Sequence, residues 1–591
     1  MQTLNYGFDI KNILRKKRML KRSLSEGENL TPKKIAVLGG STTTEIINIL
    51  ELFLLDSGIA PKFLETDYNQ YFETALFDIE RLVEFNPDVV FIHTSIVNIA
   101  KFPKLSDDTN VINDLLEDEL TKFRAIWEAL ATLNCLIIQN NFDLPVDRSL
   151  GNLDSIDSHG KSYFVNQLND QFATSARENK NLLINDINYL SAYIGLNKWF
   201  DRSLWYTSKY ALSMEAIPEL AFNVAKIIKS AFGLSKKCIV LDLDNTCWGG
   251  VIGDEGVGGI KIGSGDAVSE AHSDFQKYII QLKQRGIVLA VCSKNDLDNA
   301  KEGFTHPESP LKMEDFSEFK ANWLNKPENI KSIVDELNIG MESVVFIDDS
   351  PLERDIVSQL MPMITVPDVG DNILDFISHI DRNGYFEPTT LSVEDINRSK
   401  YYKMNAENKQ NEAAFNNYED FLDTLQMVAN VDVFESKYLD RITQLVNKTN
   451  QFNLTTKRYS ISEISSIANS ENYITQSCRL SDKYGEHGLV SVMLGEIKDV
   501  TCNIGLWLMS CRVFKRDLEF AMMDSFIKQC LKRNIKYVVG SYVSKDKNAM
   551  VSKIYEDVGF DLIEENDGGA VFKLDVASYV TKNKRIEVLG I

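Results

Sequence analysis

Short apolar runs alternate with amphipathic stretches over residues 31–232. The runs KIAVLGG, DVVFIHTS and CLIIQNN, at 34–40, 88–95 and 135–141, predict buried strands. The stretch EIINILELFLLDSG at 45–58 and a second stretch near 215–229 predict helices. This alternation is typical of βαβ units around a parallel sheet.

A second α/β region is predicted for residues 233–390, after a Gly-Leu-Ser-Lys-Lys seam at 233–237. Its apolar runs CIVLDLD, IVLAVCSKND and SVVFIDD each end in polar, mostly acidic residues. Because an open parallel sheet carries its active site at the carboxyl ends of its strands, we expect these endings to converge.

The remaining residues, 391–591, predict an α+β domain behind a charged helical connector at 393–417. Strands are expected in GLVSVMLGEIK, NIGLWLMSC and KYVVGSY, and helices at 518–533 and just before Gly559. The fold class is therefore α/β multidomain, with two parallel-sheet domains and one α+β domain. Residues 1–30 are predicted to form a basic tail with a frayed, solvated helix, or alternatively an anchor for an acidic partner.

Composition narrows the function. A chain of 591 residues is too long for a single hydrophobic core, so several domains are expected. Its 64 Lys+Arg and 85 Asp+Glu give a net charge of -21, which disfavours binding to nucleic acid or anionic lipid. The eight cysteines lack zinc-like spacing and are expected to be reduced thiols. No apolar run approaches the about 18 residues of a membrane span. We therefore expect a cytoplasmic protein with no membrane span, and leave its oligomeric state open.

Two aspartates follow the first strand of the second region. Asp242 and Asp244 are two positions apart, so an extended backbone points both carboxylates the same way. One carboxylate can attack phosphorus while the other protonates the leaving oxygen. The acids Asp348 and Asp349 after the third strand would complete a Mg²⁺ site, since Mg²⁺ prefers oxygen ligands. Taken singly, these acids can also be read as solvated strand ends.

Two further residues suit a phosphate. Ser293 ends the second strand and can hydrogen-bond a phosphoryl oxygen. Lys326 precedes Pro327, a favoured first helical residue, so its ammonium is expected at a helix N-terminus where anions bind.

In this order, the motifs DxDxT, Ser, Lys and an acidic pair resemble those of the haloacid dehalogenase (HAD) phosphatase superfamily. The resemblance implies that Asp242 is the nucleophile and Asp244 the general acid/base. It also implies phosphate contacts from Thr246, Ser293 and Lys326, and Mg²⁺ bound by Asp242, the Asp244 backbone, Asp348 and Asp349. The segments between the motifs are too short for a large cap, so the site is expected to be open.

The text around these motifs, DLDNTCWGGVIGDEGVGGIKIG and FIDDSPLERD, resembles the HAD module of FkbH-like proteins. Downstream, NKTNQFNLTTKRYS, LSDKYGEHGLVSV and MSCRVFKRDLE resemble their acyltransferase half, which is related to the GNAT fold. The resemblance implies dephosphorylation of a phosphoglyceryl-type acyl group and its transfer as a thioester to an acyl carrier protein. Because carrier proteins are usually acidic and this chain has a net charge of -21, docking would require a local basic patch, for which Lys515 and Arg516 are candidates. The alternatives are a stand-alone phosphatase in surface polysaccharide or lipid precursor biosynthesis, and a non-catalytic scaffold.

Within that half, Cys511 is the candidate acyl-carrying nucleophile, because it precedes a helix N-terminus and Arg512, which favour a thiolate. His487 is its candidate base. A buried cysteine and a surface histidine are the alternatives. The GNAT resemblance adds Asn548 and Tyr555 as substrate-binding residues, whereas the turn at 512–517 lacks the glycines that cradle coenzyme A.

The opening IAVLGGSTTTEI resembles the first block of SGNH hydrolases, with Ser41 as the serine. A capping box of Thr42 with Glu45 explains the same cluster without catalysis. The family's late Asp-x-x-His corresponds to residues 201–207, which contain no histidine, and His93 and Asn98 do not match its Gly-x-Asn-Asp. We therefore expect an SGNH-like fold that positions partners or covers the phosphatase site.

Overall fold

The computed structural model describes residues 4–27, 30–398, 400–402, 418–449, 451–510, 513–566 and 568–590. The chain divides into two compact units. The first unit comprises residues 1–231 with 460–462, and the second comprises 232–459 with 463–591. In the part of the chain that is described, no helix has the length and apolar character needed to cross a membrane. The finer boundaries at 30, 232 and 390 remain predictions.

The first unit is built on a five-stranded sheet in the order β2-β1-β3-β4-β5, and every pairing is parallel. The sequence patterns at β1, β3 and β4 are confirmed as strands. The strands span β1 (Thr31–Gly39), β2 (Ile59–Glu65), β3 (Val89–His93), β4 (Leu136–Asn140) and β5 (Leu182–Asn185).

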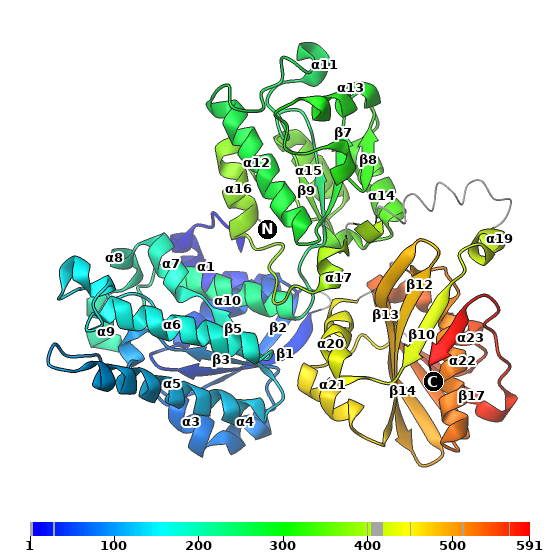
Figure 1. Ribbon diagram of the computed structural model, residues 1–591, viewed down its shortest axis with the longest axis horizontal. Helices are drawn as coiled ribbons and strands as arrows, with labels where there is room; N and C mark the ends of the chain where they lie inside the picture. The colour runs from blue at the N-terminus through cyan, green and yellow to red at the C-terminus, as the bar shows by residue number, and fades with distance from the viewer. Residues whose placement is uncertain are drawn as a thin grey trace. The chain divides into compact units, whose positions relative to one another are not determined.

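Helices cover this sheet, and Figure 1 shows them in blue and cyan. Alternate strand residues point to opposite faces, so each strand contributes to two packing layers. On one face, Ala36 and Leu38 share a core with apolar residues of α5 (Thr109–Ala131) and α6 (Lys161–Glu178). The helices α2 (Thr44–Asp56) and α10 (Ile217–Ala231) pack against each other. Smaller helices complete the unit: α3 (Tyr71–Phe77), α4 (Ile79–Phe85), α7 (Ile187–Ile194), α8 (Leu196–Trp199) and α9 (Arg202–Ser208).

Two expectations about the start of the chain are wrong. The basic stretch lies in α1 (Ile10–Ser25), which buries Ile13, Leu20 and Leu24 and packs on α2 rather than forming a frayed tail. Glu45 does not close a capping box; it pairs with Lys17 at 2.5 Å, and the helix begins after Thr43 without a side-chain cap. The apolar residues of α1 lie on one face of the helix, so it packs on α2 although most of its other residues are charged or polar.

The second unit contains a four-stranded parallel sheet in the order β8-β7-β6-β9. These strands are β6 (Cys238–Leu241), β7 (Val288–Ser293), β8 (Glu318–Ala321) and β9 (Val344–Ile347). Its two faces carry separate cores, one shared with α12 (Ala267–Gln284) and α16 (Ile373–Arg382), the other with α14 (Lys326–Leu337) and α15 (Pro351–Leu360). The short helices α11 (Ile252–Glu255) and α13 (Leu297–Glu302) lie near the strand ends (Figure 1).

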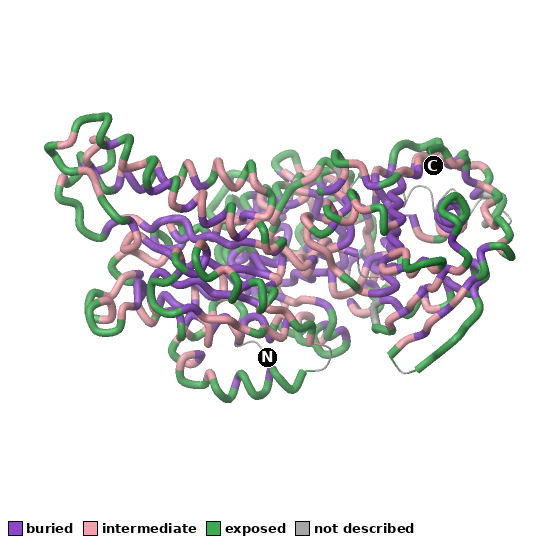
Figure 2. Tube along the Cα trace, turned by 90° about the horizontal axis from the view of Figure 1, so that it is seen from below, coloured by how far each residue is buried: buried purple, intermediate pink, exposed green. Residues whose placement is uncertain are grey.

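The same unit carries a mixed sheet in the order β16-β17-β15-β14-β13-β12-β10-β18, with β11 paired to β14. Most neighbours are antiparallel, but β14 and β15 run parallel, as do β10 and β18. In Figure 2 the buried, purple stretches of the chain lie mostly inside, whereas many of the turns at the surface are green. The strands are β10 (Val428–Asp432), β11 (Phe452–Asn453), β12 (Tyr473–Asp482), β13 (Gly485–Lys498), β14 (Thr501–Met509), β15 (Tyr537–Val543), β16 (Asp561–Asn566), β17 (Gly569–Asp575) and β18 (Glu587–Gly590).

Helices that pack on this mixed sheet are α20 (Leu439–Lys448), α22 (Leu518–Lys532) and α23 (Ile554–Asp557). The helix α21 (Ile461–Ala468) precedes β12. The connector includes α17 (Val393–Ile396) and α19 (Tyr418–Asp423), whereas the expected helix at 403–417 lies outside the described residues.

The parallel pair β14 and β15 separates after Ile504, where its register ends opposite Gly540. Residues 452–454 fill the space between the diverging strands. Leu454 donates its N–H to the Trp507 carbonyl at 3.2 Å, and its own carbonyl accepts the Val543 N–H at 2.8 Å. The sheet is therefore closed by the chain itself at this point.

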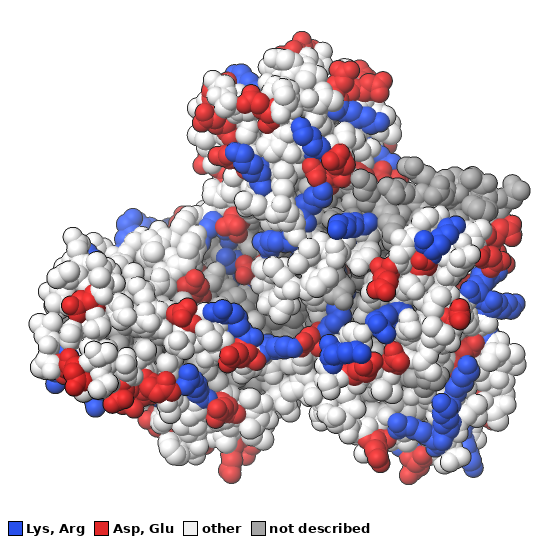
Figure 3. All heavy atoms as spheres, viewed as in Figure 1, with Lys and Arg blue, Asp and Glu red and all other residues white. Residues whose placement is uncertain are grey.

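Acidic and basic side chains are intermixed over the face of the molecule that Figure 3 shows. The net charge of -21 is not gathered in one acidic surface there.

Candidate functional site

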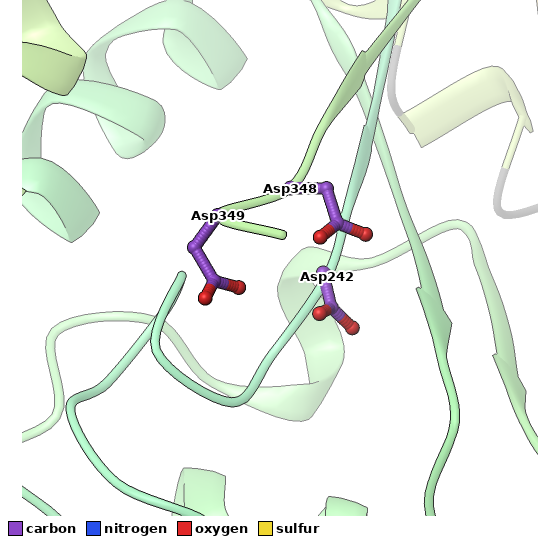
Figure 4. Close-up of side chains that lie close together, drawn as sticks. All are labelled: Asp242, Asp348 and Asp349. Carbon is purple, nitrogen blue, oxygen red and sulfur yellow. The ribbon is translucent and has the colours of Figure 1, made fainter. Parts of the chain in front are cut away.

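Three carboxylates converge at the carboxyl ends of neighbouring strands in the four-stranded sheet. Asp242 follows β6, and Asp348 and Asp349 follow β9, which pairs with β6 in parallel. One oxygen of each lies within 4.8 Å of the others (Figure 4). The convergence expected from the strand endings is thus observed.

A buried lysine holds two of these acids together. Lys326 begins α14, where the sequence predicted it, with Pro327 in the first turn. Its ammonium lies 3.0 Å from Asp242 Oδ2 and also bonds Asp348 Oδ2. Since Lys326 and Asp348 are 2% and 0% exposed, the pair is shielded from solvent.

Burial and mutual repulsion disfavour charge on the acids. Burial, together with the charge of Asp242, raises the pKa of Asp348 to about 6 and also raises the pKa of Asp349. Burial alone would lower the pKa of Lys326, but Asp242 and Asp348 raise it well above its usual value. The site therefore carries an excess of negative charge that Lys326 only partly offsets.

Asp244 is held apart from this cluster by three donors. Its Oδ1 accepts from Trp248 Nε1 at 2.9 Å and from the Ile252 N–H at 3.1 Å, while Oδ2 accepts from Asn295 Nδ2 at 3.0 Å. Burial raises the pKa of its carboxyl, although these hydrogen bonds oppose the effect. A carboxyl with a raised pKa and a fixed orientation suits a proton donor.

Further contacts fix the loop that carries the acidic pair. Thr246 Oγ1 accepts the Asp349 N–H at 3.1 Å and lies 3.2 Å from Asp349 Oδ1. Arg354, on α15, donates to the carbonyls of Asp348 and Asp349 at 2.9 and 2.7 Å. Thr246 thus positions a carboxylate here, beside its predicted role as a substrate contact.

Ser293 ends β7 and is buried, at the same edge of the sheet as the acids. Hydrophobic periodicity and residue spacing do not identify Trp248, Asn295 or Arg354 as site residues. They come from loops and a helix, and the sequence pointed to them only as members of the segments DLDNTCWGG, CSKND and SPLERD.

The donor set fits a magnesium ion. Asp242, Asp348 and Asp349 offer hard oxygen ligands, two of them from buried residues. Three carboxylates this close together repel one another, and a bound divalent cation would relieve that repulsion.

In the mixed-sheet part, His487 is fully buried, which excludes the surface-histidine interpretation. Its Nε2 lies 2.8 Å from Asp482 Oδ2, and Arg516 Nη1 reaches the same oxygen at 2.5 Å. Although burial opposes it, the contacts with His487 and Arg516 lower the pKa of Asp482 to about 2. Arg516 is therefore buried in an ion pair and unsuited to an exposed docking patch. Cys511 lies outside the described residues.

Asn548 and Tyr555 are not brought to His487 by any described contact. Asn548 donates to the carbonyls of Asn453 and Val543 at 2.9 and 3.0 Å, so it ties residues 452–454 to β15. Tyr555 is fully buried, and its ring packs against Trp507, Phe560 and Phe572. Both side chains serve the core in this structure.

In the first unit, Ser41 is buried, with no hydrogen-bond partner for its hydroxyl among the described atoms. Asn98 donates to the Gly40 carbonyl at 2.7 Å, and Asp201 caps α9 through the Leu204 N–H at 3.1 Å. His93 is also buried and bonds Asn140 through Nδ1 at 2.9 Å. No described contact joins the serine to a histidine.

Comparison with known proteins identifies relatives of this chain. The FkbH N-terminal domain family matches residues 34–229. A solved structure of the N-terminal part of protein BF1531 from Bacteroides fragilis, which contains a phosphatase domain and is complexed with Mg, is 31% identical with a TM-score of 0.59. The match covers 63% of this chain and 99% of that one. No curated protein sequence matches.

Two acetyltransferase structures match a smaller part. The ribosomal-protein-S18-alanine N-acetyltransferase of Escherichia coli is 12% identical, covering 25% of this chain and 94% of that chain. An N-acetyltransferase of Staphylococcus aureus Mu50 is 15% identical, covering 26% and 99%. Both TM-scores are 0.21, so the description of the mixed sheet rests on its own topology. The chain belongs to the same family as BF1531, and its residues 34–229 form the FkbH N-terminal domain.

Proposed function

We propose that the second unit is a Mg²⁺-dependent phosphatase of the HAD type, in which Asp242 is the nucleophile and Asp244 the general acid/base. The observation that supports this proposal most strongly is the cluster of Asp242, Asp348 and Asp349 around buried Lys326. Phosphorylated small molecules are the substrate class, because three carboxylates that can hold Mg²⁺ suit a phosphate dianion.

The reaction uses the two aspartates in turn. Asp242 forms a bond to phosphorus as the ester P–O bond breaks, and Asp244 gives its proton to the leaving oxygen. Asp244 then takes a proton from water, which attacks the aspartyl phosphate and releases inorganic phosphate. Asp242, Asp348 and Asp349 would hold Mg²⁺, which supplies positive charge toward the phosphoryl oxygens. Lys326 keeps the Asp242 carboxylate in place and adds a second positive charge to that of Mg²⁺.

Two substitutions test these roles. Asp242→Asn should lower Mg²⁺-dependent hydrolysis of p-nitrophenyl phosphate by at least about 10³-fold, because no carboxylate remains to attack phosphorus. Asp244→Asn should cost about 10²–10⁴-fold with an alkyl phosphate, whose leaving oxygen needs a proton, and less with p-nitrophenyl phosphate. Asp355→Asn, an exposed position on α15, is the matched control and should leave both rates unchanged. Full activity in the Asp242 variant would refute the proposal.

We further propose acyl transfer to an acyl carrier protein as the function of the mixed-sheet part. The supporting observation is the buried pair of His487 and Asp482, in which His487 is the candidate base and Asp482 fixes the orientation of its ring. Arg516 also bonds Asp482, and it belongs to the turn that follows Cys511 in sequence. When Nε2 of neutral His487 donates to Asp482, the basic lone pair is on Nδ1. The donor would be a phosphoglyceryl-type acyl group, and the fold of the mixed sheet is proposed to be GNAT-like.

Mass spectrometry of a carrier protein incubated with the chain and a phosphorylated acyl donor tests this second step. A mass gain that requires Cys511 and falls in His487→Gln supports transfer. An unchanged carrier with continued phosphate release favours the stand-alone phosphatase in precursor biosynthesis. Absence of turnover with any phosphate monoester favours the scaffold. For the first unit we propose an SGNH-like fold without esterase activity, since Ser41 is buried and no described histidine contacts it.

A further inference from the structure

The outward face of α1, in the first unit, carries a row of positive charges. Seven residues of this helix are basic and none is acidic. Four of the basic residues recur at intervals of four, three and four positions, which places them in one line along the helix over a length of about 16 Å. We call this line the basic stripe, and its members, all exposed, are Lys11, Arg15, Arg18 and Arg22.

The opposite side of α1 fixes the helix to the fold. Ile13, Leu20 and Leu24 are buried, and α1 packs on α2. At about 100° per residue, these three side chains point roughly 180° away from the stripe. The stripe is therefore presented by an anchored helix and faces away from the unit that carries it.

Acidic residues of α2 neutralise only one flank of α1. Lys17 forms an ion pair with Glu45 at 2.5 Å. Lys21, one turn further along, pairs with Glu51 at 2.6 Å. These two lysines thus add to the attachment of α1, and they are not members of the stripe.

The stripe itself has almost no acidic counterpart in its own unit. Among the described residues, neither a hydrogen bond nor an ion pair engages Lys11, Arg15 or Arg18. Arg22, at the end of the stripe, contacts Glu26 at 3.4 Å, and both side chains are largely exposed. An exposed pair of this kind contributes little, so all four cations are available to a partner.

The surroundings of the stripe favour a small protein as the partner. The chain as a whole has a net charge of -21, so a nucleic acid or a bilayer that extended beyond the stripe would meet acidic surface. Helices that bind bilayers insert an apolar face, but the buried side of α1 is already occupied by α2. Met19 is the one large apolar residue that α1 exposes. A compact acidic protein can touch the helix alone.

We propose that the basic stripe is the docking surface for the acyl carrier protein, which binds it through carboxylates on a carrier helix. The identity of this partner rests on the proposed acyl transfer, since that step calls for a carrier. Carboxylates three or four residues apart on a helix match the spacing of the stripe. Three of its four members are arginines, and a guanidinium group pairs with a carboxylate through two parallel hydrogen bonds.

This location differs from the basic patch that the sequence suggested. Arg516 is 7% exposed and lies in an ion pair with Asp482, so it does not offer its charge at the surface. An acidic carrier is attracted by the stripe and repelled by the acidic remainder of the chain. Opposed fields of this kind orient the encounter as well as strengthen it.

Fluorescence anisotropy tests the docking surface, with the labelled apo form of the acyl carrier protein from the same organism titrated with the full chain. The apo form lacks the phosphopantetheine arm, so binding reports the protein surface. Arg15→Glu combined with Arg18→Glu should weaken binding at least about 10-fold, because each reversal removes an attraction and adds a repulsion. Absence of binding by the unmodified chain, or equal binding by this double variant, would overturn the proposal.

The matched control is Lys528→Glu combined with Lys532→Glu. It changes the net charge by the same amount at two exposed positions one turn apart on α22, and it should bind like the unmodified chain. An equal loss in this control would assign the effect to overall charge and refute the stripe. Both double variants should keep the urea midpoints of the unmodified chain, because the four positions are exposed.

Failure of docking and failure of the proposed function give different results. Asp242→Asn should bind the carrier unchanged, so a chain without phosphatase activity still tests the stripe. Binding without a mass gain of the carrier would count against acyl transfer and leave the docking surface standing. A carrier that gains mass equally fast with the Arg15→Glu and Arg18→Glu chain would show transfer without this docking surface.

A second measurement needs no variant. A carbodiimide joins a carboxylate to a lysine amine in contact with it, and peptide mass spectrometry identifies the two residues. Lys11 in the stripe and exposed Lys16 beside it should be joined to carrier carboxylates, whereas Lys528 and Lys532 should not. Crosslinks confined to lysines outside α1 would contradict the proposal. Binding of phosphatidylserine vesicles in place of the carrier would make the stripe a membrane contact and also overturn it.

Discussion

Lys326 and the acids around it are arranged by a simple sequence rule. Residues that directly follow parallel strands share one edge of the sheet, which is why Asp242, Asp348 and Asp349 could be placed together from sequence. The groups that hold Asp244 could not. Trp248 and Asn295 reach it through side-chain hydrogen bonds from loops, and neither strand periodicity nor spacing encodes the direction of such contacts.

A residue in the first unit predicts a dependence of stability on pH. Burial lowers the pKa of His93 to about 4, below its usual 6.5, so the unfolded chain takes up the proton first as the pH falls. The contribution of neutral His93 is therefore complete above pH 6.5 and is lost as the pH falls toward 4. Between pH 7.5 and pH 5 this amounts to about 2 kcal/mol in the free energy of unfolding.

Urea unfolding followed by tryptophan fluorescence checks this expectation. His93→Gln keeps an acceptor for Asn140 but does not titrate near neutral pH, so its first unit should lose about 2 kcal/mol less than the unmodified chain between those pH values. Equal losses would mean that His93 is protonated in the folded unit.

At the scale of elements, apolar runs predicted six strands of the two parallel sheets, β1, β3, β4, β6, β7 and β9, because buried parallel strands are apolar on both faces. The strands β2 and β5 of the first sheet were not predicted. The strand β8 (Glu318–Ala321) was not predicted, since three of its four residues are only half-buried and the segment is polar. The prediction of a frayed, solvated helix at α1 is wrong because only three widely spaced apolar residues, Ile13, Leu20 and Leu24, are buried among its many charged residues. Short edge strands and sparsely apolar helices depend on their tertiary neighbours, which a local pattern does not contain.

The contact between the connector and the parallel-sheet part yields a stability prediction. Gly286→Ala would place a Cβ against the Asp395 carbonyl in a left-handed backbone, so it should lower the free energy of unfolding of the second unit by more than about 1 kcal/mol. Gly258→Ala is the matched control, because its Cβ meets no atom within 4 Å. Equal urea midpoints for the two variants would show that the connector does not pack there.

For the whole molecule, the two units give separate expectations for metal removal. The three acids that can hold Mg²⁺ all belong to the second unit, so the ion should stabilise that unit by about 1.4 kcal/mol at ten times its dissociation constant. Differential scanning calorimetry with Mg²⁺ and with EDTA measures the shift in melting temperature. Asp348→Asn should abolish the shift, and an undiminished shift in that variant would place the ion elsewhere.

The segment 452–454 limits how an extended ligand can bind the mixed sheet. It already hydrogen-bonds main-chain groups of both β14 and β15 where they diverge, and the Asn548 side chain donates to the Asn453 carbonyl as well. An extended ligand that paired there as an additional strand would first have to displace residues 452–454 and break their hydrogen bonds. A ligand of the mixed sheet is therefore expected to bind through side-chain contacts on the face of the sheet, and not by main-chain pairing between β14 and β15.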